Sequence, residues 1–342
     1  MKKRYIFNVG LGLLVFFYLE YRLGFRRSYE ALLAVDFRFL APAVAAFFLS
    51  QLVRLVKWRF FYKKGRIRTS FAEVALFYFN LKLFGMLTPG RIGEFLPALT
   101  APSGKGSLFS FTGYDRLTEA MATLTVAIVA FTVLLHGTAS TGLLPWVLLL
   151  IFLMALLSYF LVRNAWMMGL AERLGRRLEK HNRFKIVRRI LAQEERIAIE
   201  IRFLQRTFRK LFAPHTAAPV FVITFTALAV DMLFWWLLFR SIGVSLSPIT
   251  LVAAMAVFNV TGFFSPTPGG IGVSDSFFVL FLKKIGVEGA FGTFVLLLRF
   301  SVIGLTVVCR FGVGGWIAFR AARRRAAERE AAAPDSGRPS SG

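Results

Sequence analysis

The sequence Thr-Pro-Gly-Arg-Ile-Gly at residues 88–93 decides the fold, because it returns as Thr-Pro-Gly-Gly-Ile-Gly at residues 267–272. The two copies agree at five of six positions, and each divides an apolar stretch into two arms. We interpret this recurrence as a structural repeat. The arms of the first stretch cover about 70–86 and 92–101, and those of the second cover 248–264 and 273–285.

Around these stretches the composition is that of an integral membrane protein. Of the 342 residues, 56% are hydrophobic. They gather in blocks near the length that crosses ~30 Å of hydrocarbon. The formal charge of +25 comes from 43 Lys and Arg against 18 Asp and Glu, and the basic residues lie between the apolar blocks. We therefore interpret them as topology signals and as contacts to anionic lipid, and we expect no nucleic-acid partner.

The apolar blocks predict an all-α, polytopic transmembrane helix bundle with about six full spans and two re-entrant, broken-helix segments. The first span follows Met-Lys-Lys-Arg and resembles a signal peptide, but Glu20, Tyr21 and Arg22 stand where small residues would mark a cleavage site. We expect this span to remain uncleaved. The six spans are expected at about 5–19, 39–56, 108–135, 143–162, 217–239 and 290–318.

One transmembrane domain is expected over residues 1–320, with the two repeats at about 39–162 and 217–319. Between them a cationic insert at 163–215 is predicted to be cytoplasmic, and apolar residues recur in it at helical spacing. This insert is either an amphipathic helix on the inner leaflet or a solvated helical hairpin packed on the bundle. The tail at 321–342 is rich in Ala, Ser, Pro and Gly, which predicts a disordered cytoplasmic segment.

Charge placement predicts how the two broken segments are oriented. Basic residues remain on the cytoplasmic side, so the run at 57–68 and the insert both indicate the inside. The first broken segment then begins and ends inside, whereas the second begins and ends outside. Such inverted-topology repeats place a substrate site near the membrane midplane in many secondary transporters. The same reasoning places both termini in the cytoplasm. We expect a multi-pass protein of the bacterial cytoplasmic (inner) membrane.

The residues of the two breaks suit irregular backbone at membrane depth. Pro89 and Pro268 end the incoming helices, and the glycines permit unusual dihedral angles and close approach of another backbone. Each outgoing arm would then begin near the midplane, where the amides of a helix N-terminus favour an anion. With Arg91 nearby, two facing termini would attract a phosphate headgroup. The alternative interpretation is that both motifs are tight turns between short helices.

At these residues the chain resembles the lysylphosphatidylglycerol synthase transmembrane-region family, which is also called flippase-like. The segment Pro-Gly-Arg-Ile-Gly-Glu at 89–94 is similar to that family's Pro-Gly-Arg-Leu-Gly-Glu. The segment Asp-Arg-Leu at 115–117, with Glu119, is similar to the Glu-Arg-Leu that follows in the family. Residues 266–272 match the second family motif, which is usually followed by Glu where this chain has Asp275.

This resemblance extends over roughly residues 5–320 and implies a membrane protein that moves or handles polar lipids. Family members accompany aminoacyl-phospholipid, hopanoid and polyprenyl-linked sugar pathways. We therefore expect a flippase or transporter that moves an anionic lipid of one of these classes between leaflets. In the bifunctional synthases a soluble aminoacyl-transfer domain follows the membrane part, and we expect this chain to lack it. The alternatives are a membrane-embedded transferase acting on a lipid-linked substrate and a scaffold that docks a synthase through the insert.

Charged residues inside apolar segments cost ~2.5–3.5 kcal/mol on insertion scales and are therefore the first candidates for a site. Arg91 would bind phosphate, while Glu94 pairs with it, carries a proton or caps the outgoing helix. Arg299 needs a partner, which is either Asp275 or Asp231. The full set of candidate substrate-binding residues is Pro89, Gly90, Arg91, Gly93, Glu94, Asp115, Arg116, Glu119, Pro268, Gly269, Gly270, Gly272, Asp275 and Arg299.

Two groups of charges have alternative interpretations. Asp115, Arg116 and Glu119 either belong to the site or form a salt-bridge set at the cytoplasmic surface, given their helical spacing. Lys82 either faces the same cavity or pairs with Glu73.

The sequence predicts no cofactor, no metal site and no catalytic residue set. His136, His181 and His215 are dispersed, and Cys309 is the single cysteine, so the usual ligand clusters are missing. We therefore expect a protein that is not an enzyme, with the transferase kept as the alternative. The expected partners are membrane lipids, among them anionic lipid of the inner leaflet, and a synthase.

Overall fold

The computed structural model describes residues 25–101, 105–135, 210–287 and 291–332, with a few single residues outside these ranges. Within them all regular secondary structure is helical, which confirms the all-α prediction. The first half contains α2 (Phe25–Leu33), α3 (Phe37–Lys64), α4 (Phe71–Met86), η1 (Ile92–Phe95), α5 (Leu96–Thr100) and α6 (Lys105–Leu135). The second half contains α11 (Pro214–Ser241), α12 (Pro248–Phe264), α13 (Val273–Lys284), α14 (Phe291–Arg299), the π-helical turn η2 (Phe300–Gly304) and α15 (Leu305–Ala332).

Four helical segments of the described chain are long and apolar enough to cross a bilayer, by length and composition. They match four of the expected spans, and α14, η2 and α15 together form the last one. The expected spans at 5–19 and 143–162, and nearly all of the insert at 163–215, lie outside the described residues. The four segments are Phe37–Lys64, Gly106–Leu134, Pro214–Ser241 and Phe291–Arg323.

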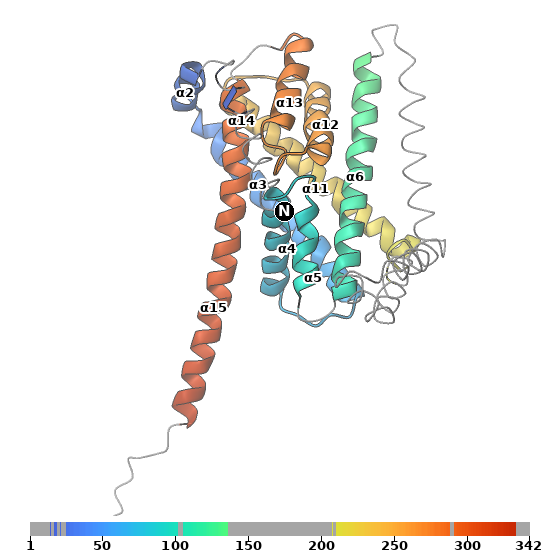
Figure 1. Cartoon of the computed structure of the whole chain (residues 1–342), viewed down its shortest axis with the longest axis vertical. Helices are drawn as coiled ribbons and strands as arrows, with labels where there is room; N and C mark the ends of the chain where they lie inside the picture. Colours follow the sequence, from blue (N-terminus) through green and yellow to red (C-terminus); the bar gives the residue numbers. More distant parts are fainter. Residues whose placement is uncertain are drawn as a thin grey trace, which may run out of the picture.

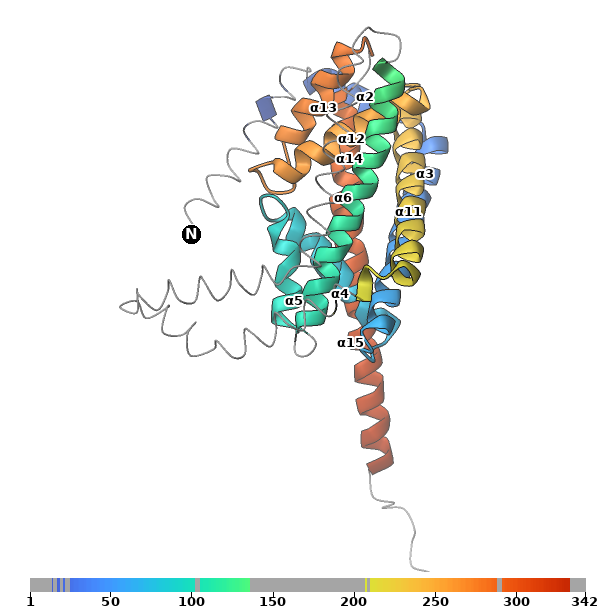
Figure 2. The ribbon, with the colours of Figure 1, turned by 90° about the vertical axis from the view of Figure 1, so that its right-hand side faces the viewer.

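Both halves repeat one order of elements: a long helix, a shorter helix, a break, a short outgoing arm and another long helix. The shorter helix and its outgoing arm lie side by side in each half, α4 with α5 and α12 with α13. In Figure 1 the first pair lies in the lower part of the bundle and the second in the upper part, so the breaks face each other between them. Figure 2 shows the same arrangement from the side. The predicted arms are therefore present at the predicted places.

The long helices α3 and α11 pack along each other in opposite directions. At one end the backbone N–H of Asp36 donates to the carbonyl of Ser241 at 2.8 Å. Toward the other end Lys57 Nζ donates to Thr224 Oγ1 at 3.4 Å. This antiparallel pair forms one wall of the bundle and carries charged side chains toward its centre.

Each shorter helix also packs on a long helix of the other half, α4 on α15 and α12 on α6. Arg310 of α15 donates from Nε to Asn80 Oδ1 of α4 at 3.1 Å. The halves are therefore interleaved, which holds the two breaks in one place.

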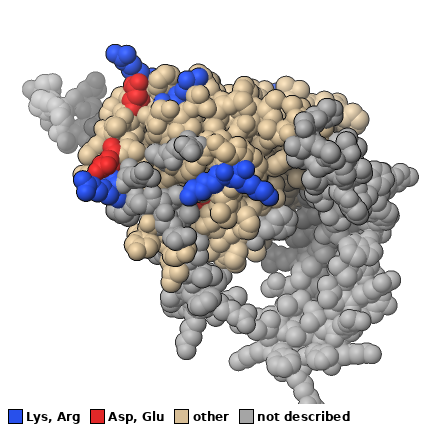
Figure 3. All heavy atoms as spheres, turned by 90° about the horizontal axis from the view of Figure 1, so that it is seen from above, with Lys and Arg blue, Asp and Glu red and all other residues tan. Residues whose placement is uncertain are grey.

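The hydrophobic core is divided into two clusters, and each of them contains residues from both halves. Trp58 and Phe61 lie in the first, and Phe239 and Phe294, whose ring centroids are 3.8 Å apart, lie in the second. Only 28–44% of the most apolar window of each candidate span is buried inside the protein. Large side chains such as Phe300 are exposed, and the end of the bundle seen in Figure 3 carries only scattered charges. Such an apolar exterior is what contact with lipid tails requires.

Local sequence accounts for where the arms begin. The Ser70 hydroxyl accepts from the Glu73 amide, and the Glu73 carboxylate accepts from the Ser70 amide, so α4 starts with a capping box. In the second half the Ser247 hydroxyl caps α12 and Pro248 occupies its first turn, where a missing N–H costs nothing.

The expected tail differs from the structure in one respect. Helix α15 continues to Ala332, well beyond residue 320, where a disordered segment was expected to begin. The added residues are mainly Ala, Arg and Glu, which are strong helix formers, and this preference outweighs the low-complexity composition. The rest of the expected tail, from 333 onward, lies outside the described residues.

Candidate functional site

The two breaks touch each other at the centre of the bundle. Pro89 and Pro268 form an isolated antiparallel β-bridge, and the amide of Gly90 donates to the carbonyl of Ser265 at 3.2 Å. A Cβ at Gly269 would lie 3.0 Å from the carbonyl oxygen of Met86, so the backbones approach as closely as glycine permits. The motif pair thus forms a single backbone junction.

Both breaks use left-handed backbone, and one of the residues that adopts it is not glycine. Gly90, Gly269 and Gly270 have φ values of +58°, +60° and +74°. Arg91, which aligns with Gly270, has a φ of +57°. For a residue with a side chain this conformation costs about 1 kcal/mol, and such strain concentrates at functional sites. Arg91 is therefore placed there against its own backbone preference.

The backbone amides of the breaks are already bonded within the loops, which corrects the expectation of two anion-binding helix termini. Gly93 N–H donates to Thr88 Oγ1 at 2.6 Å, and Glu94 N–H donates to the carbonyl of Arg91 at 3.1 Å. In the second break Gly272 N–H donates to Asp275 Oδ2 at 2.8 Å. Because loop oxygens satisfy these donors, an anion here has to be recognised by side chains.

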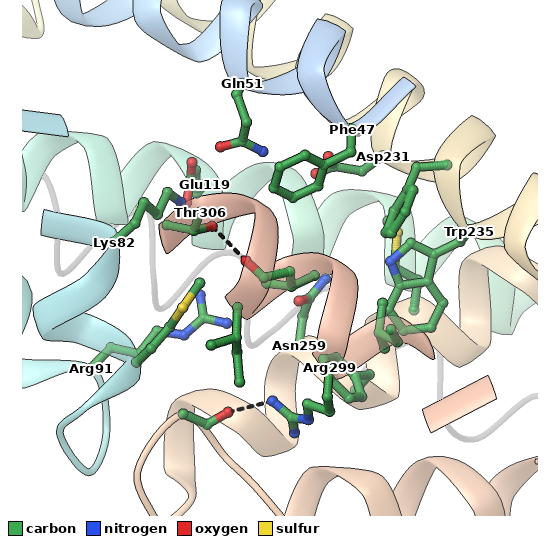
Figure 4. A pocket seen from close by; sticks show the side chains of 18 of the residues that line it. Phe47, Gln51, Lys82, Arg91, Glu119, Asp231, Trp235, Asn259, Arg299 and Thr306 are labelled. Carbon is green, nitrogen blue, oxygen red and sulfur yellow. Dashed lines mark hydrogen bonds between the residues drawn. The ribbon is translucent and has the colours of Figure 1, made fainter. Parts of the chain in front are cut away.

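A cavity of about 180 Å³ lies beside the junction, between α3, α4, α11, α12 and the π-helical turn η2 (Figure 4). One part of its wall is aromatic, with Phe47, Phe234, Trp235, Phe258 and Phe263. The charged side chains that line it are Arg54, Lys82, Arg91, Glu94, Glu119, Asp231 and Arg299. A cavity with this many charges inside an apolar bundle is a functional candidate by default.

Behind the first break, Arg116 of α6 holds a group of acids together. Its guanidinium bonds Glu94 at 2.5 Å, Glu119 at 2.7 Å and Asp115 at 3.2 Å. Asp115 Oδ1 also forms a salt bridge with Lys57 Nζ at 2.6 Å, and the side chains of Asp115 and Lys57 are 1% and 0% exposed. On α6, Asp115 is thus buried, and Arg116 and Glu119 are only 12% and 13% exposed, so these residues are not a salt-bridge set at a surface.

At the second break Arg299 has the equivalent role. Its Nη2 lies 2.9 Å from Asp275 Oδ1, and its Nη1 donates to the carbonyl of Gly269 at 2.8 Å. The partner of Arg299 is therefore Asp275 and not Asp231. In each half an arginine on the long helix after the break bonds a carboxylate that belongs to the break itself.

A third set of charges joins α3 to α11 and escaped the sequence analysis. Arg54 bonds both oxygens of Asp231, reaches Glu119 at 3.3 Å and contacts Ser50, which also bonds Asp231. Ser50, Arg54 and Lys57 recur at steps of four and three, so they share one face of α3. That spacing was the available signal, but Lys57 was assigned to a basic run at the cytoplasmic surface instead.

Lys82 and Arg91 differ from the other cavity cations, because neither makes a salt bridge with any carboxylate in the described part of the chain. The Lys82 ammonium lies 5.5 Å from the ring centroid of Tyr78, and the Arg91 guanidinium lies 5.3 Å from that of Phe263. Glu73 bonds the cap of α4, so it is not the partner of Lys82. Figure 4 shows both cations at one side of the cavity. They are the donors that remain available to an anionic ligand.

The predicted site residues fall into three groups. Five of them line the cavity: Arg91, Glu94, Glu119, Gly269 and Arg299. Three bond those from behind, namely Asp115, Arg116 and Asp275. The others shape the two loops: Pro89, Gly90, Gly93, Pro268, Gly270 and Gly272. Among the described residues no group of His, Cys, Asp and Glu has the arrangement of a metal site.

Comparison with known proteins gives a consistent result. The family model described as the lysylphosphatidylglycerol synthase TM region matches residues 5–328. A UPF0104 membrane protein of Pyrococcus horikoshii is 23% identical over 311 residues, which are 87% of this chain and 92% of that protein. No solved structure matches the chain.

Proposed function

Because the chain belongs to the family of the lysylphosphatidylglycerol synthase transmembrane region, we propose that this multi-pass membrane protein moves an anionic polar lipid between the leaflets of its bilayer. The headgroup enters the cavity at the junction of the breaks, and the acyl or prenyl tails remain in the surrounding lipid. Alternate opening of the cavity toward the two faces completes the movement.

One observation carries this proposal: two cations that have no carboxylate partner among the described residues face a cavity inside an apolar bundle. Lys82 and Arg91 can both donate to a phosphate group, while the surrounding acids are held by other cations. An intramembrane charge without a partner is costly unless a ligand or water compensates it. A phosphate-bearing headgroup supplies that compensation as it passes through the cavity.

The proposed topology has about six spans, with both breaks entering the membrane from opposite faces. The arms support it: η1 and α5 together cover Ile92–Thr100, and at 1.5 Å per residue such an arm reaches about half of the hydrocarbon thickness. The interleaved packing of α4 and α12 provides the protein cover that irregular backbone needs at this depth. In this topology both termini are cytoplasmic.

The contacts favour transport over a membrane-embedded transferase. A transferase requires a carboxylate that is free to act as a base, and the predicted pair was Asp115 with Glu119. Asp115 forms salt bridges with Lys57 and Arg116, while Glu119 accepts from Arg116 at 2.7 Å and from Arg54. Because the oxygens of both carboxylates face cations of the protein, neither side chain is free to take the role of that base.

Reconstitution into liposomes tests the proposal. Phosphatidylglycerol labelled on one tail is added, and a membrane-impermeant quencher reports which leaflet holds the label. We expect the wild-type protein to move the lipid, Lys82→Met and Arg91→Gly to move it at least tenfold more slowly, and Lys284→Met, on the exposed end of α13, to match the wild type. Equal rates for all four proteins and for empty liposomes would refute the proposal.

A further inference from the structure

Every carboxylate around the cavity already has a cation from the protein. Glu94 and Glu119 bond Arg116, and Asp231 bonds Arg54. Behind them Asp115 bonds Lys57 and Asp275 bonds Arg299. Among the described residues of the site the negative charges are therefore all engaged.

The positive charges are not. Lys82 and Arg91 lie at one side of the cavity, and Figure 4 shows Asp231, Phe47 and Trp235 at the other. The faces of Tyr78 and Phe263 are occupied by Lys82 and Arg91 themselves, so these rings are not open to a cation from a ligand. In the part of the chain that the structure describes, the cavity offers free donors for an anion and no free carboxylate for an amine.

Building on the proposed function, we propose that the cavity selects headgroups that carry a phosphate ester and no ammonium group. The phosphate is held by Lys82 and Arg91, and hydroxyl or other uncharged substituents extend toward Asn259 and the aromatic wall. An ammonium on the headgroup would enter a space of low dielectric beside Arg54 and Arg299 with no acid left to bond it. Aminoacylated and zwitterionic phospholipids are thus discriminated against, although the family is described by a lysylated lipid.

The size of the cavity supports a small headgroup. Its volume of about 180 Å³ is below the range of roughly 300–1,000 Å³ that is usual for whole ligands. It holds a phosphate with a short polar substituent, and the lipid tails lie outside.

A comparison of the transport rates of three lipids tests this selection. The wild-type protein in liposomes receives, in separate assays, tail-labelled phosphatidylglycerol, phosphatidylethanolamine and lysyl-phosphatidylglycerol. We expect phosphatidylglycerol to move at least tenfold faster than the two amine-bearing lipids. Comparable rates for all three lipids overturn the selection and leave the transport function standing.

If no lipid moves in the liposomes, equilibrium binding tests the headgroup selection separately from the transport function. Short-chain phosphatidylglycerol and its lysylated form are titrated against the protein in detergent, and inorganic phosphate is added as a competitor. Preferential binding of the anionic lipid supports the selection even where transport fails, and equal binding overturns it. If millimolar inorganic phosphate displaces the lipid, the phosphate is the recognised group of the lipid. If inorganic phosphate displaces the lipid at a concentration no higher than that of the lipid itself, the site is one for free phosphate instead of a lipid.

Two variants test whether a free carboxylate in the cavity allows transport of an amine-bearing lipid. Arg54→Met frees the Asp231 carboxylate inside the cavity, and we expect the rate of lysyl-phosphatidylglycerol relative to phosphatidylglycerol to rise at least fivefold. Arg54→Met/Asp231→Asn removes that carboxylate again, and the ratio returns toward the wild-type value. Ratios that stay unchanged in both variants, each purified as a monodisperse protein, contradict the role of the missing acid. Should Arg54→Met fail to fold, Gln51→Glu adds a carboxylate to the same wall, and the same rise is expected.

Discussion

The first and the second break have the same loop and different chemistry. Both place a Thr-Pro-Gly turn at the junction, and both are held by an arginine from the following long helix, Arg116 in one half and Arg299 in the other. They differ at one motif position, where the first has Arg91 and the second has Gly270, both with positive φ. The second break, with Gly270, thus serves as an internal control for the effect of the strained Arg91 on the charge and stability of the first break.

Packing enforces this difference. A Cβ at Gly270 would lie 3.2 Å from the Cα of Gly262 and would overlap the hydroxyl of Ser274. The first break has room for a side chain at the same place, and that side chain lines the cavity. The comparison teaches that a symmetric backbone positions the site, while side chains that differ between the halves, Arg91 among them, give the cavity its positive charge.

The largest expected effect comes from removing the brace of the second break. Arg299→Met leaves Asp275 buried without a cation, and we expect a loss of about 3–5 kcal/mol in the free energy of unfolding. Arg299→Met/Asp275→Asn should recover a large part of it, because no unpaired charge remains. Denaturant titration of the purified protein measures both. A stability within 1 kcal/mol of wild type for the single variant would show that Arg299 does not brace the second break.

The next test places an arginine in the second break, at the position that Arg91 occupies in the first. Gly270→Arg combines the crowding against Ser274 with backbone strain, and we expect a loss of about 2–3 kcal/mol. Gly243 has a φ of +77° and no atom within 4 Å of a Cβ built on it. Gly243→Arg therefore isolates the strain, and about 1 kcal/mol is expected in the same titration. Equal losses for both variants would remove crowding from the explanation.

The reverse copy has a smaller effect on stability and a large one on transport. Arg91→Gly relieves the left-handed strain, so we expect the protein to become more stable by about 1 kcal/mol, while lipid movement falls at least tenfold. Arg91→Lys retains the charge and the strain and should keep measurable transport. A less stable Arg91→Gly protein with normal transport would reverse the interpretation of the strained residue.

The smallest expected effect on stability concerns the start of α4. Hydrogen bonds from Thr69 and Ser70 hold the pKa of Glu73 below its ordinary value, so the ionised carboxylate stabilises the start of α4. Glu73→Gln should cost about 0.5 kcal/mol at neutral pH. A lowered pKa contributes stability that is fully present above the ordinary pKa of a glutamate. The difference from wild type should therefore shrink as the pH falls below that ordinary pKa and vanish once the pH is below the lowered pKa of Glu73. A difference that persists at acidic pH would point to packing instead of charge.

Much of this fold follows from the sequence because proline and glycine interrupt it at two matching places. The helices α12 and α13 begin where the second apolar stretch and the end of its motif predict, and α4 begins one residue later than expected. The arginines at the breaks were also identified, because charges in apolar stretches are conspicuous.

The salt-bridge partners of those charged residues depend on tertiary packing, so they could not be predicted from the sequence. Arg54 and Asp231 are distant in sequence and meet only because α3 and α11 pack antiparallel. Lys57 lies in a basic run that resembles a surface signal, yet the side chain is fully buried. The satisfied amides of the breaks were missed because loop hydroxyl and carboxylate groups fold back on them.

The most direct test of the account joins the breaks by a disulfide. Paired residues of an antiparallel bridge have Cα atoms about 4.5–5.5 Å apart, which suits a disulfide, so Pro89→Cys and Pro268→Cys are combined in a Cys309→Ala background. We expect the pair to cross-link within one chain in the membrane, to stop lipid movement when oxidised and to restore it on reduction. Two results would contradict a transport site at this junction. One is a failure of the two cysteines to cross-link, and the other is a fully cross-linked protein that moves lipid as fast as the same protein without the disulfide.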